Sequence, residues 1–596
     1  MAATGTATAE QPSIASYGAH GNGQPDFGPN VKIFDPTMST GQIKAVVDAI
    51  AAQQVPNQFG AERYSLLFKP GTYGTSTEPL NFEVGYYTSV AGLGLSPNDV
   101  VINGSVYVRN QCDANKFCTA LNNFWRSLSN LTINVTNPDF GCYSGQFWAV
   151  SQAAPMRRVH VQGQTTLMDY CSNPSFASGG FIADSQFDGQ VINGSQQQWM
   201  TRNSVLNGWS NGVWNQVFAG TVGAPAECFP LTPSCGPYTT VEKNPVTREA
   251  PVLYADAAGR YQVFVPATRR DSVGTSWGNG PAAGRSIPLD KFFVAKPGDD
   301  VKDINNALAR GKNLLLTPGI YPTDQTIKVK RADTVVLGLG YATIVPQRGN
   351  IAMTVADVAG VDISGLVFDA GPRNSRLLLQ VGTKNSHRGS YHNPTALQDV
   401  FFRIGGAAAG KATVSLEVNS DYTILDNTWA WRADHGEGVG WTVNTADTGV
   451  IVNGDKVTAY GLFVEHYQKT EVIWNGNGGT VIFFQNELPY DPPNQAAWRQ
   501  SPTVNGWAAL QITRHVKSFH GYGMGSYSFF NQGVDIYADN AFQVDATLPP
   551  GSLHNLLTIF LDPANGKGGI LNVVNGIGGS STIANPDVPV TVVNFP

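Results

Sequence analysis

The chain has 596 residues and a formal net charge of −6, and charged residues make up only 14% of it. A chain of this length is too long to fold around one ordinary hydrophobic core, so two domains or a long repetitive array are expected. The sequence has no basic stripe, which argues against nucleic acid as a partner, and no apolar run long enough to cross a membrane. Its 65 glycines, with many Asn, Thr, Ser and Val residues, favour strands joined by tight turns.

The first residues, MAATGTATAEQPS, lack a charged segment followed by an apolar one. We interpret them as the start of a mature protein with an added methionine, from which a signal peptide has been removed. The six cysteines lie in the first half, and their even number and two close pairs predict local disulfides in a secreted protein. The predicted pairs are Cys112–Cys118, Cys142–Cys171 and Cys228–Cys235. The alternatives are six reduced thiols or a metal site, but no Cys-x-x-Cys spacing supports zinc.

The same order of elements occurs twice along the chain. A Gly-rich turn at Tyr17–Gly23 precedes a predicted amphipathic helix, an apolar run that ends in Pro-Gly-x-Tyr, and a Gly-Leu-Gly segment. In the first half these are Ile43–Gln53, Leu66–Tyr73 and Val90–Gly94; in the second they are Val301–Ala309, Leu314–Tyr321 and Val336–Gly340. This repetition indicates an internal duplication, in which each half begins with a helix that caps one end of a strand array.

Short runs of strand character recur about every 20–35 residues without helices between them. They are Leu128–Ile133, Met156–Val161, Ile363–Phe368, Leu397–Phe402 and Ile424–Trp429. A doubly wound α/β fold would need helical crossovers, which are missing. The pattern therefore predicts an all-β protein made of two right-handed parallel β-helices side by side, with a cleft between them.

Three parts of the chain are expected from this pattern. Residues 1–236 should form an N-terminal β-helix and residues 297–596 a C-terminal β-helix. Residues 237–296 contain several Pro and Gly and little repeat character, so they are interpreted as a long linker packed across both halves. Nothing indicates a symmetric interface, so a monomer is expected.

Two glutamates stand out in the second half. Glu465 and Glu487 each end an apolar run, and they are 22 residues apart, which is about one coil. Residues one coil apart stack at the strand spacing of about 4.8 Å. Two carboxyls that close cannot both ionise freely, so one pKa should be raised. A carboxyl that stays protonated at neutral pH can act as general acid on a glycosidic oxygen.

The same residues also have a purely structural interpretation. A glutamate at the end of a strand is most often solvated, and Asp434-His435 could be a turn pair. Asn130 and Asn427 are interpreted as structural ladder residues. The aromatic residues around the glutamates suit stacking on sugar rings, although tryptophans more often fill a core; they are Trp429, Trp431, Trp441, Trp474, Tyr490 and Trp498. The coincidence of two glutamates one coil apart, aromatic density and a proline-rich loop favours function.

Three segments resemble glycoside hydrolase family 55, the β-1,3-glucanases of bacteria and fungi. They are Trp429–Gly436 (WAWRADHG), Gly461–His466 (GLFVEH) and Gln485–Asp491 (QNELPYD), and the resemblance extends over nearly the whole chain. It implies an inverting, exo-acting enzyme that releases glucose from β-1,3-glucan (laminarin) without metal or cofactor.

The resemblance also implies site residues. Glu487 would be the general acid. Glu465, Gln152 and Ser178 would form the network that holds the attacking water. Trp431, Asp434 and Tyr490 would bind the sugar. Because Gln152 and Ser178 come from the first half, the site should exist only where the halves meet.

One tension and two alternatives remain open at this point. Stacked carboxylates about 5 Å apart are typical of retaining enzymes, whereas inverting pairs stand about 6.5–9.5 Å apart. The stacked spacing and an inverting mechanism agree if a water lies between Glu465, Gln152 and Ser178, away from the leaving-group side of Glu487. A polysaccharide lyase would need Ca²⁺ ligands and a basic residue, and neither is evident. A non-catalytic adhesin or carbohydrate-binding β-helix would keep the aromatics without needing Glu487. Exo action rests on the resemblance alone, and neither the accepted chain length nor tolerance of β-1,6 branches follows from the sequence.

Overall fold

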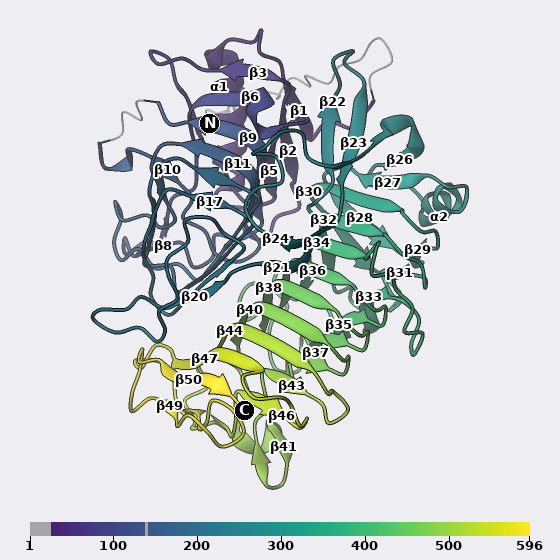
Figure 1. The fold of residues 1–596 in the computed structure, drawn as a ribbon. Coiled ribbons are helices and arrows are strands. Elements are labelled where there is room, and N and C mark those ends of the chain that lie inside the picture. Colours follow the sequence, from purple (N-terminus) through teal and green to yellow (C-terminus); the bar gives the residue numbers. More distant parts are fainter. Residues whose placement is uncertain (1–24, 137–140) are drawn as a thin grey trace, which may run out of the picture.

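The computed structural model of the chain describes residues 25–136 and 141–596. The first residues, on which the expectation of a mature secreted start rests, and the turn at 17–23 lie outside this range. The described chain consists mainly of strands that pair with the next coil, and its two α-helices are α1 (Thr40–Gln54) and α2 (Val301–Ala309) (Figure 1). None of its helices is long and apolar enough to span a bilayer.

The first half forms a parallel β-helix whose main sheet follows the chain order. Its central path runs through β1 (Val31–Phe34), β2 (Tyr64–Phe68), β5 (Thr88–Gly92), β9 (Arg126–Asn134), β11 (Met156–Gln162), β13 (Phe181–Ala183), β16 (Gln198–Arg202), β19 (Asn215–Ala219) and β20 (Tyr238–Val241). Each pair along this path is parallel. A second sheet, with β10 (Gln146–Phe147) and β12 (Thr165–Thr166) at one end, belongs to the same coils.

The second half forms a longer parallel β-helix with two main sheets. The larger one contains β26 (Phe292–Ala295), β27 (Asn313–Leu316), β30 (Val335–Pro346), β32 (Asp362–Asp369), β34 (Ala396–Ile404), β36 (Ile424–Arg432), β38 (Thr458–Glu465), β40 (Gly479–Glu487), β44 (Phe519–Ser528), β47 (Leu553–Phe560) and β50 (Val590–Phe595). The other contains β29 (Ile327–Val329), β31 (Met353–Val355), β33 (Ser375–Val381), β35 (Ala412–Val418), β37 (Thr448–Val452), β39 (Val472–Trp474), β43 (Leu510–Ile512) and β46 (Phe542–Val544). Only β50 pairs antiparallel in the larger sheet, where it closes the C-terminal end. The predicted pair of parallel β-helices is thus confirmed.

Both helices occupy the predicted places. α1 begins after Ser39, whose hydroxyl forms a capping box with Gln42, and it includes the predicted range 43–53. α2 has the predicted bounds and is capped by Asp300. The apolar side of each helix packs into the core of its own half, as Ile43 and Ile304 show. Each helix therefore covers the first coil of a β-helix, as the duplication predicted.

The segment between the halves contains two small antiparallel sheets. One pairs β21 (Asn244–Thr247) with β24 (Arg269–Ser272); the other contains β22 (Val252–Ala255), β23 (Tyr261–Pro266) and β25 (Gly284–Pro288). The segment touches both halves, because Glu249 binds Arg202 of the first and Arg248 forms an ion pair with Asp362 of the second. Strand pairing extends the first β-helix to β20, a few residues beyond the predicted boundary at 236. It begins the second β-helix at β26, a few residues before the predicted boundary at 297.

The two halves share an apolar and ionic interface. One buried cluster contains Trp125 and Phe181 from the first half together with Trp429 and Phe463 from the second. Beside it, two arginines of the first half, Arg157 and Arg202, form buried ion pairs. Arg157 Nε lies 2.6 Å from Asp399 Oδ2, and Arg202 NH2 lies 2.5 Å from Asp426 Oδ2. Because these groups are withdrawn from water, their pairing fixes how the halves sit against one another.

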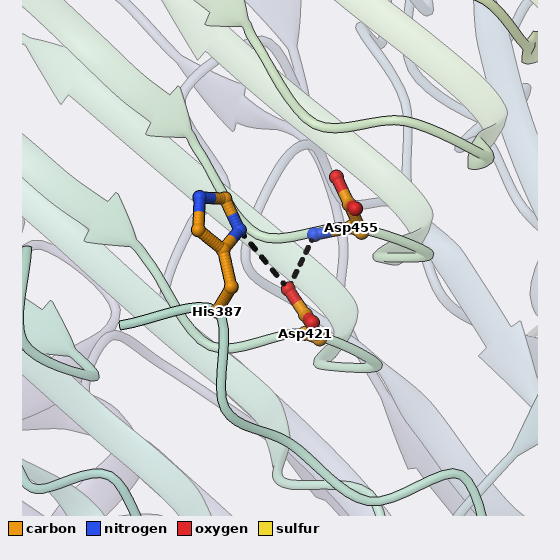
Figure 2. A group of neighbouring side chains, drawn as sticks. All are labelled: His387, Asp421 and Asp455. Atoms are coloured by element: carbon orange, nitrogen blue, oxygen red, sulfur yellow. Dashed lines mark hydrogen bonds and ion pairs between the residues drawn. The ribbon is translucent and has the colours of Figure 1, made fainter. Parts of the chain in front are cut away.

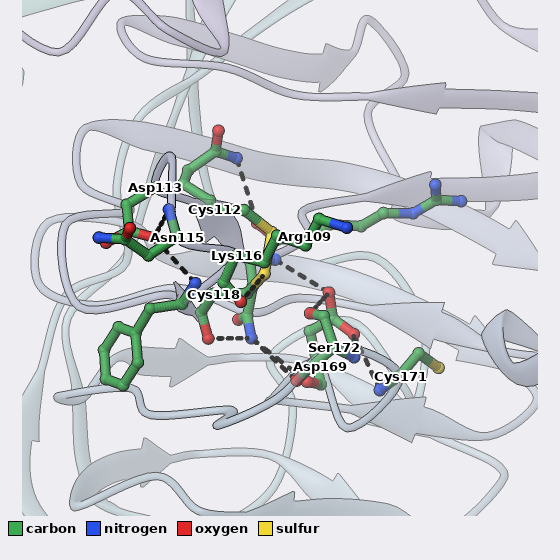
Figure 3. Close-up of a disulfide and its surroundings, with 12 residues drawn as sticks. Arg109, Cys112, Asp113, Asn115, Lys116, Cys118, Asp169, Cys171 and Ser172 are labelled. Carbon is green, nitrogen blue, oxygen red and sulfur yellow. Dashed lines mark hydrogen bonds between the residues drawn. A yellow bond between two sulfur atoms is a disulfide. The ribbon is translucent and has the colours of Figure 1, made fainter.

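The three predicted disulfides are confirmed, and the described chain has no free cysteine. Cys112–Cys118 closes a short hairpin, and the loop of Cys171 lies beside it (Figure 3). The carboxylate of Asp169 accepts backbone N–H groups from Asn110 and Cys171, so it ties the two loops together. The alternatives of six reduced thiols or a metal site are excluded by this pairing.

Candidate active site

Glu465 and Glu487 lie in register on neighbouring strands, as their 22-residue spacing predicted. They end β38 and β40, which pair in parallel with Glu465 opposite Glu487. Both strands bend at a residue with positive φ, Gly461 (58°) and Phe483 (67°). After these bends, Leu462 and Phe484 face the interior of the coil, while both glutamates project from the outer face toward the first half.

The carboxylate of Glu465 receives two hydrogen bonds from N–H groups. Gln152 Nε2 donates to Oε1 over 2.9 Å, and Trp429 Nε1 donates to Oε2 over 2.7 Å. Ser178 Oγ in turn donates to Gln152 Oε1 over 3.0 Å, and its backbone N–H binds Ser151 Oγ. The chain Ser178–Gln152–Glu465 thus crosses from the first half to the second.

Glu487 has a different set of partners. The hydroxyl of Tyr490 donates to its Oε2, and Gln485 Nε2 lies 3.3 Å from its Oε1. The ring of Tyr490 is held edge-on between His466 and Phe529, at centroid distances of 4.3 Å and 4.9 Å. Glu487 is partly exposed, whereas Glu465 is 3% exposed. The two carboxyls therefore differ in access as well as in hydrogen bonding.

Both glutamate pKa values are raised. Burial and then the charge of Glu487 raise the pKa of Glu465 well above its usual range, against the hydrogen bonds of Trp429 and Gln485. Burial also raises the pKa of Glu487, while His466 and Tyr490 oppose the shift. Because each charge disfavours the other, the pair holds one proton to higher pH than a free carboxyl does.

Asp434, a neighbour of this pair, has a lowered pKa. Burial would raise its pKa, but the hydrogen bond of His435 and the charges of His466 and His435 lower it to about 2. His435 Nδ1 lies 3.0 Å from Asp434 Oδ1, and its Nε2 contacts the side-chain amide of Gln58 in the first half. Asp434 therefore offers a fixed anionic acceptor for hydroxyl groups.

All seven site residues expected from the family resemblance line one cavity of about 750 Å³. Its wall includes Gln152, Ser178, Trp431, Asp434, Glu465, Glu487 and Tyr490, together with Phe124 and Trp214 of the first half. In the described chain its lining contains no lysine or arginine. The space between the halves is thus acidic and aromatic at its wall.

The aromatic residues near the glutamates divide into two groups. Trp431 and Tyr490 line the cavity. Trp429 lies behind Trp431, with a ring-centroid distance of 5.0 Å, and its role is to bind Glu465. Trp441, Trp474 and Trp498 were expected around the glutamates. Instead, Trp474 and Trp498 lie in the core of the second β-helix, and Trp441 packs against that core. None of the three lies on the strands that carry the glutamates: Trp474 ends β39 in the other sheet, and Trp441 and Trp498 lie in connecting segments.

The structure also adds neighbours that sequence reasoning missed. Gln485 contacts Glu487, and the ring of His466 packs edge-on against Tyr490. Both lie within the family segments, so their closeness to the glutamates was a usable signal. The first-half residues Phe124 and Gln58 gave no such signal, because only the packing of the two halves brings Phe124 to the cavity and Gln58 to His435. Asn130 and Asn427 link neighbouring coils, as expected of ladder residues.

A possible metal-binding group lies apart from this cavity. His387, Asp421 and Asp455 place one ligand atom each within 4.8 Å of one another (Figure 2). The two carboxylates already bind backbone, since Asp421 Oδ1 accepts from Asp455 N and Asp455 Oδ1 accepts from Asn477 N. This is a ladder of turn residues on successive coils, and none of the three lines the cavity.

Comparison with known proteins identifies the family. The model of the LAM55 pectate lyase-like domain matches residues 292–487, and that of rhamnogalacturonase A/epimerase, pectate lyase-like, matches residues 85–222. An exo-beta-1,3-glucanase of Streptomyces sp. (strain SirexAA-E / ActE) is 51% identical over 96% of this chain and 90% of its own length. The solved structure of sacteLam55A from Streptomyces sp. SirexAA-E has a TM-score of 0.88 at 49% identity, covering 96% of this chain and 99% of that one. A variant of sacteLam55A in complex with glucose gives a TM-score of 0.87 at the same identity and coverage.

The fold and these matches define a carbohydrate-active enzyme of the pectate-lyase-like β-helix class. Within this class the chain belongs to glycoside hydrolase family 55, as its sequence resemblance predicted.

Proposed function

We propose that this protein is an exo-acting β-1,3-glucanase that hydrolyses laminarin with inversion and releases glucose. The observation that carries the proposal is the hydrogen-bonded chain Ser178–Gln152–Glu465, which lines the same cavity as Glu487. The 51% identical relative is an exo-beta-1,3-glucanase, and the related sacteLam55A variant was solved with glucose.

Glu487 supplies the proton in this mechanism. The glycosidic bond breaks, and the leaving oxygen takes the proton of Glu487. A water held by Glu465, Gln152 and Ser178 forms the new bond to the anomeric carbon and gives its proton to Glu465. The mechanism needs Glu465 ionised and Glu487 protonated, and the two N–H donors on Glu465 favour its ionised form against the burial that raises its pKa. Asp434, Trp431 and Tyr490 bind the sugar ring that is released.

The stacking of the two glutamates is compatible with inversion. Their backbones are one strand apart, but Glu465 is drawn toward Gln152 and Trp429, and Glu487 toward Tyr490. We propose that this divergence leaves room for a water between Glu465 and the anomeric carbon, as inversion requires. The water-holding network, not a simple two-carboxylate pair, is therefore the proposed catalytic unit.

Two alternatives have less support. A lyase that acts on acidic sugars would need a lysine or arginine base, and the described cavity wall has neither. A carbohydrate-binding protein without activity would not need the Ser178–Gln152–Glu465 chain. We further propose that the protein is secreted, which its three disulfides support, and that it acts as a monomer of three parts, 1–236, 237–296 and 297–596.

The experiment is hydrolysis of laminarin, followed by NMR at early times and by chromatography of the products. Glucose as the sole early product, appearing first as the α-anomer, is the expected result. An initial β-anomer would contradict inversion, and a ladder of oligosaccharides would contradict exo action. The absence of any cleavage would contradict the enzyme proposal itself.

A further inference from the structure

Two buried polar groups without partners lie beside the glutamate pair. The side-chain oxygen of Gln485 and the hydroxyl of Tyr527 are both inaccessible to water, and neither forms a hydrogen bond. Gln485 is 0% exposed and Tyr527 is 1% exposed. One of these groups is an acceptor and the other is a donor. Buried polar groups are nearly always hydrogen-bonded, so an unpaired acceptor beside an unpaired donor requires an explanation.

Gln485 uses its amide nitrogen on the two glutamates. Its Nε2 lies 3.3 Å from Glu487 Oε1, and its hydrogen bond also opposes the raised pKa of Glu465. With the nitrogen committed to carboxyl oxygens, only the oxygen of this amide remains to be satisfied. A donor at that oxygen would hold the amide in one orientation and prevent its rotation.

Tyr527 is placed to supply that donor. It lies on β44 in register with Glu487, while Gly525 of the same strand is in register with Gln485. The tyrosine folds back over Gly525, where a Cβ would stand 3.0 Å from its hydroxyl. The hydroxyl therefore lies beside the register position of Gln485, which is on the preceding coil. The absence of a side chain at Gly525 leaves this space open for it.

We propose that Tyr527 is a positioning residue for the general acid: during proton transfer its hydroxyl turns to donate to Gln485 Oε1, which keeps the Gln485 amide hydrogens on Glu487. This inference rests on the proposed role of Glu487 as proton donor. Tyr527 does not line the cavity and would not touch the sugar. Its packing against Trp214, at a centroid distance of 5.7 Å, holds the ring in place.

The test is Tyr527→Phe, which removes only the hydroxyl, assayed on two substrates. Laminaribiose needs a proton on its leaving oxygen, whereas 2,4-dinitrophenyl β-glucoside does not. We expect kcat on laminaribiose to fall about tenfold with KM within about twofold, and kcat on the aryl glucoside to stay unchanged. Tyr522→Phe, the same change on the same strand outside the cavity wall, is the control and should leave both values unchanged.

A double-mutant cycle with Gln485→Leu tests the route of the effect. In the Gln485→Leu background, Tyr527→Phe should cost no further activity on laminaribiose. An additive loss would show that Tyr527 does not act through Gln485 and would overturn the inference. An equal loss on both substrates would do the same, because it would indicate a structural role.

The failure of the inference is distinguishable from the failure of the proposed function. If the wild-type protein releases glucose from laminaribiose and Tyr527→Phe matches it, only the inference is wrong. If the wild-type protein cleaves neither substrate, the proposed function is wrong.

Discussion

Gln152 and Glu465 are separated by 313 residues, yet a hydrogen bond of 2.9 Å joins their side chains. The amide belongs to the first β-helix and the carboxyl to the second. The same amide receives the hydroxyl of Ser178 on its other side. The proposed water-holding network therefore depends on the way the two halves dock, and neither half alone contains it.

Gln152→Ala should remove the link between the halves at the water site. We expect kcat on laminaribiose to fall by about a hundredfold, because the water loses its orientation, with KM changed less than threefold. Unlike a change at the general acid, this loss should also appear with 2,4-dinitrophenyl β-glucoside. Gln162→Ala, at an exposed glutamine on β11, is the matched control. Wild-type turnover of Gln152→Ala would remove this residue from the network.

Glu487→Gln keeps the shape of the side chain but removes its proton. We expect kcat on laminarin to fall by at least about a hundredfold, while calorimetry shows laminarin binding near the wild-type level. Glu437→Gln, at an exposed glutamate outside the cavity wall, should leave both unchanged. Near-wild-type activity of Glu487→Gln would refute the assignment of Glu487 as the acid.

The pH dependence of kcat/KM should report the raised carboxyl pKa values. The ionised form of Glu465 is needed, and burial and the Glu487 charge raise its pKa, so activity should fall on acidification at a pH above the usual 4.5. Trp429→Phe removes a donor that favours ionised Glu465. Its acidic limb should therefore move to still higher pH, and Trp441→Phe should leave the limb in place. A limb that does not move in Trp429→Phe would show that this hydrogen bond does not act on the charged carboxyl.

The ion network between the halves should control acid stability. Burial would raise the pKa of Glu249, but the charge and hydrogen bonds of Arg202, with Arg157, lower it from 4.5 to about 2. A lowered pKa contributes stability that is complete above pH 4.5 and is lost as the pH falls toward 2, which is about 3 kcal/mol for this shift.

Glu249→Gln should therefore be less stable than the wild type at pH 7, and the difference should shrink below pH 4.5. Urea unfolding at pH 7, 4 and 3 would measure it. Glu78→Gln, at an exposed glutamate, is the control. A stability difference that does not depend on pH would mean that Glu249 acts through packing and not through its charge.

The disulfides should differ in their contribution to stability. Cys142–Cys171 closes a separation of 29 residues and Cys112–Cys118 one of 6. The longer loop restricts the unfolded chain more, so replacing its two cysteines by serine should cost about 1 kcal/mol more than the same change in the shorter loop. Chemical unfolding under non-reducing conditions would compare the two double variants. The opposite order would show that native contacts outweigh loop entropy.

Sequence reasoning predicted the coil spacing and therefore the stacking of Glu465 on Glu487. It could not predict which tryptophans face the cavity. The residues with positive φ, Gly461 and Phe483, reset the alternation of their strands, and a phenylalanine in that conformation leaves no signal in the pattern. Trp474 was expected near the sugar because it is close to the glutamates in sequence, but it stands on β39 in the other sheet and lies inside the coil.

The first-half part of the site could be predicted only from the family resemblance. No periodicity relates Gln152 to Glu465, because their contact arises from docking two separately coiled halves. The buried ion pairs that hold this docking, such as Arg202 with Asp426, were not predicted either. Charged residues on strands are usually solvated, so only the observed interface reveals their partners.

The register between β38 and β40 limits how this protein can change in evolution. Successive side chains along a strand point to opposite faces, so deletion of one residue before Glu487 within β40 would turn that carboxyl into the coil interior. Insertions in the turns opposite the cavity leave this alternation intact, as does the addition of whole coils at the end of the β-helix. Natural relatives should therefore vary in turn length and coil number, while the length of these two strands stays fixed.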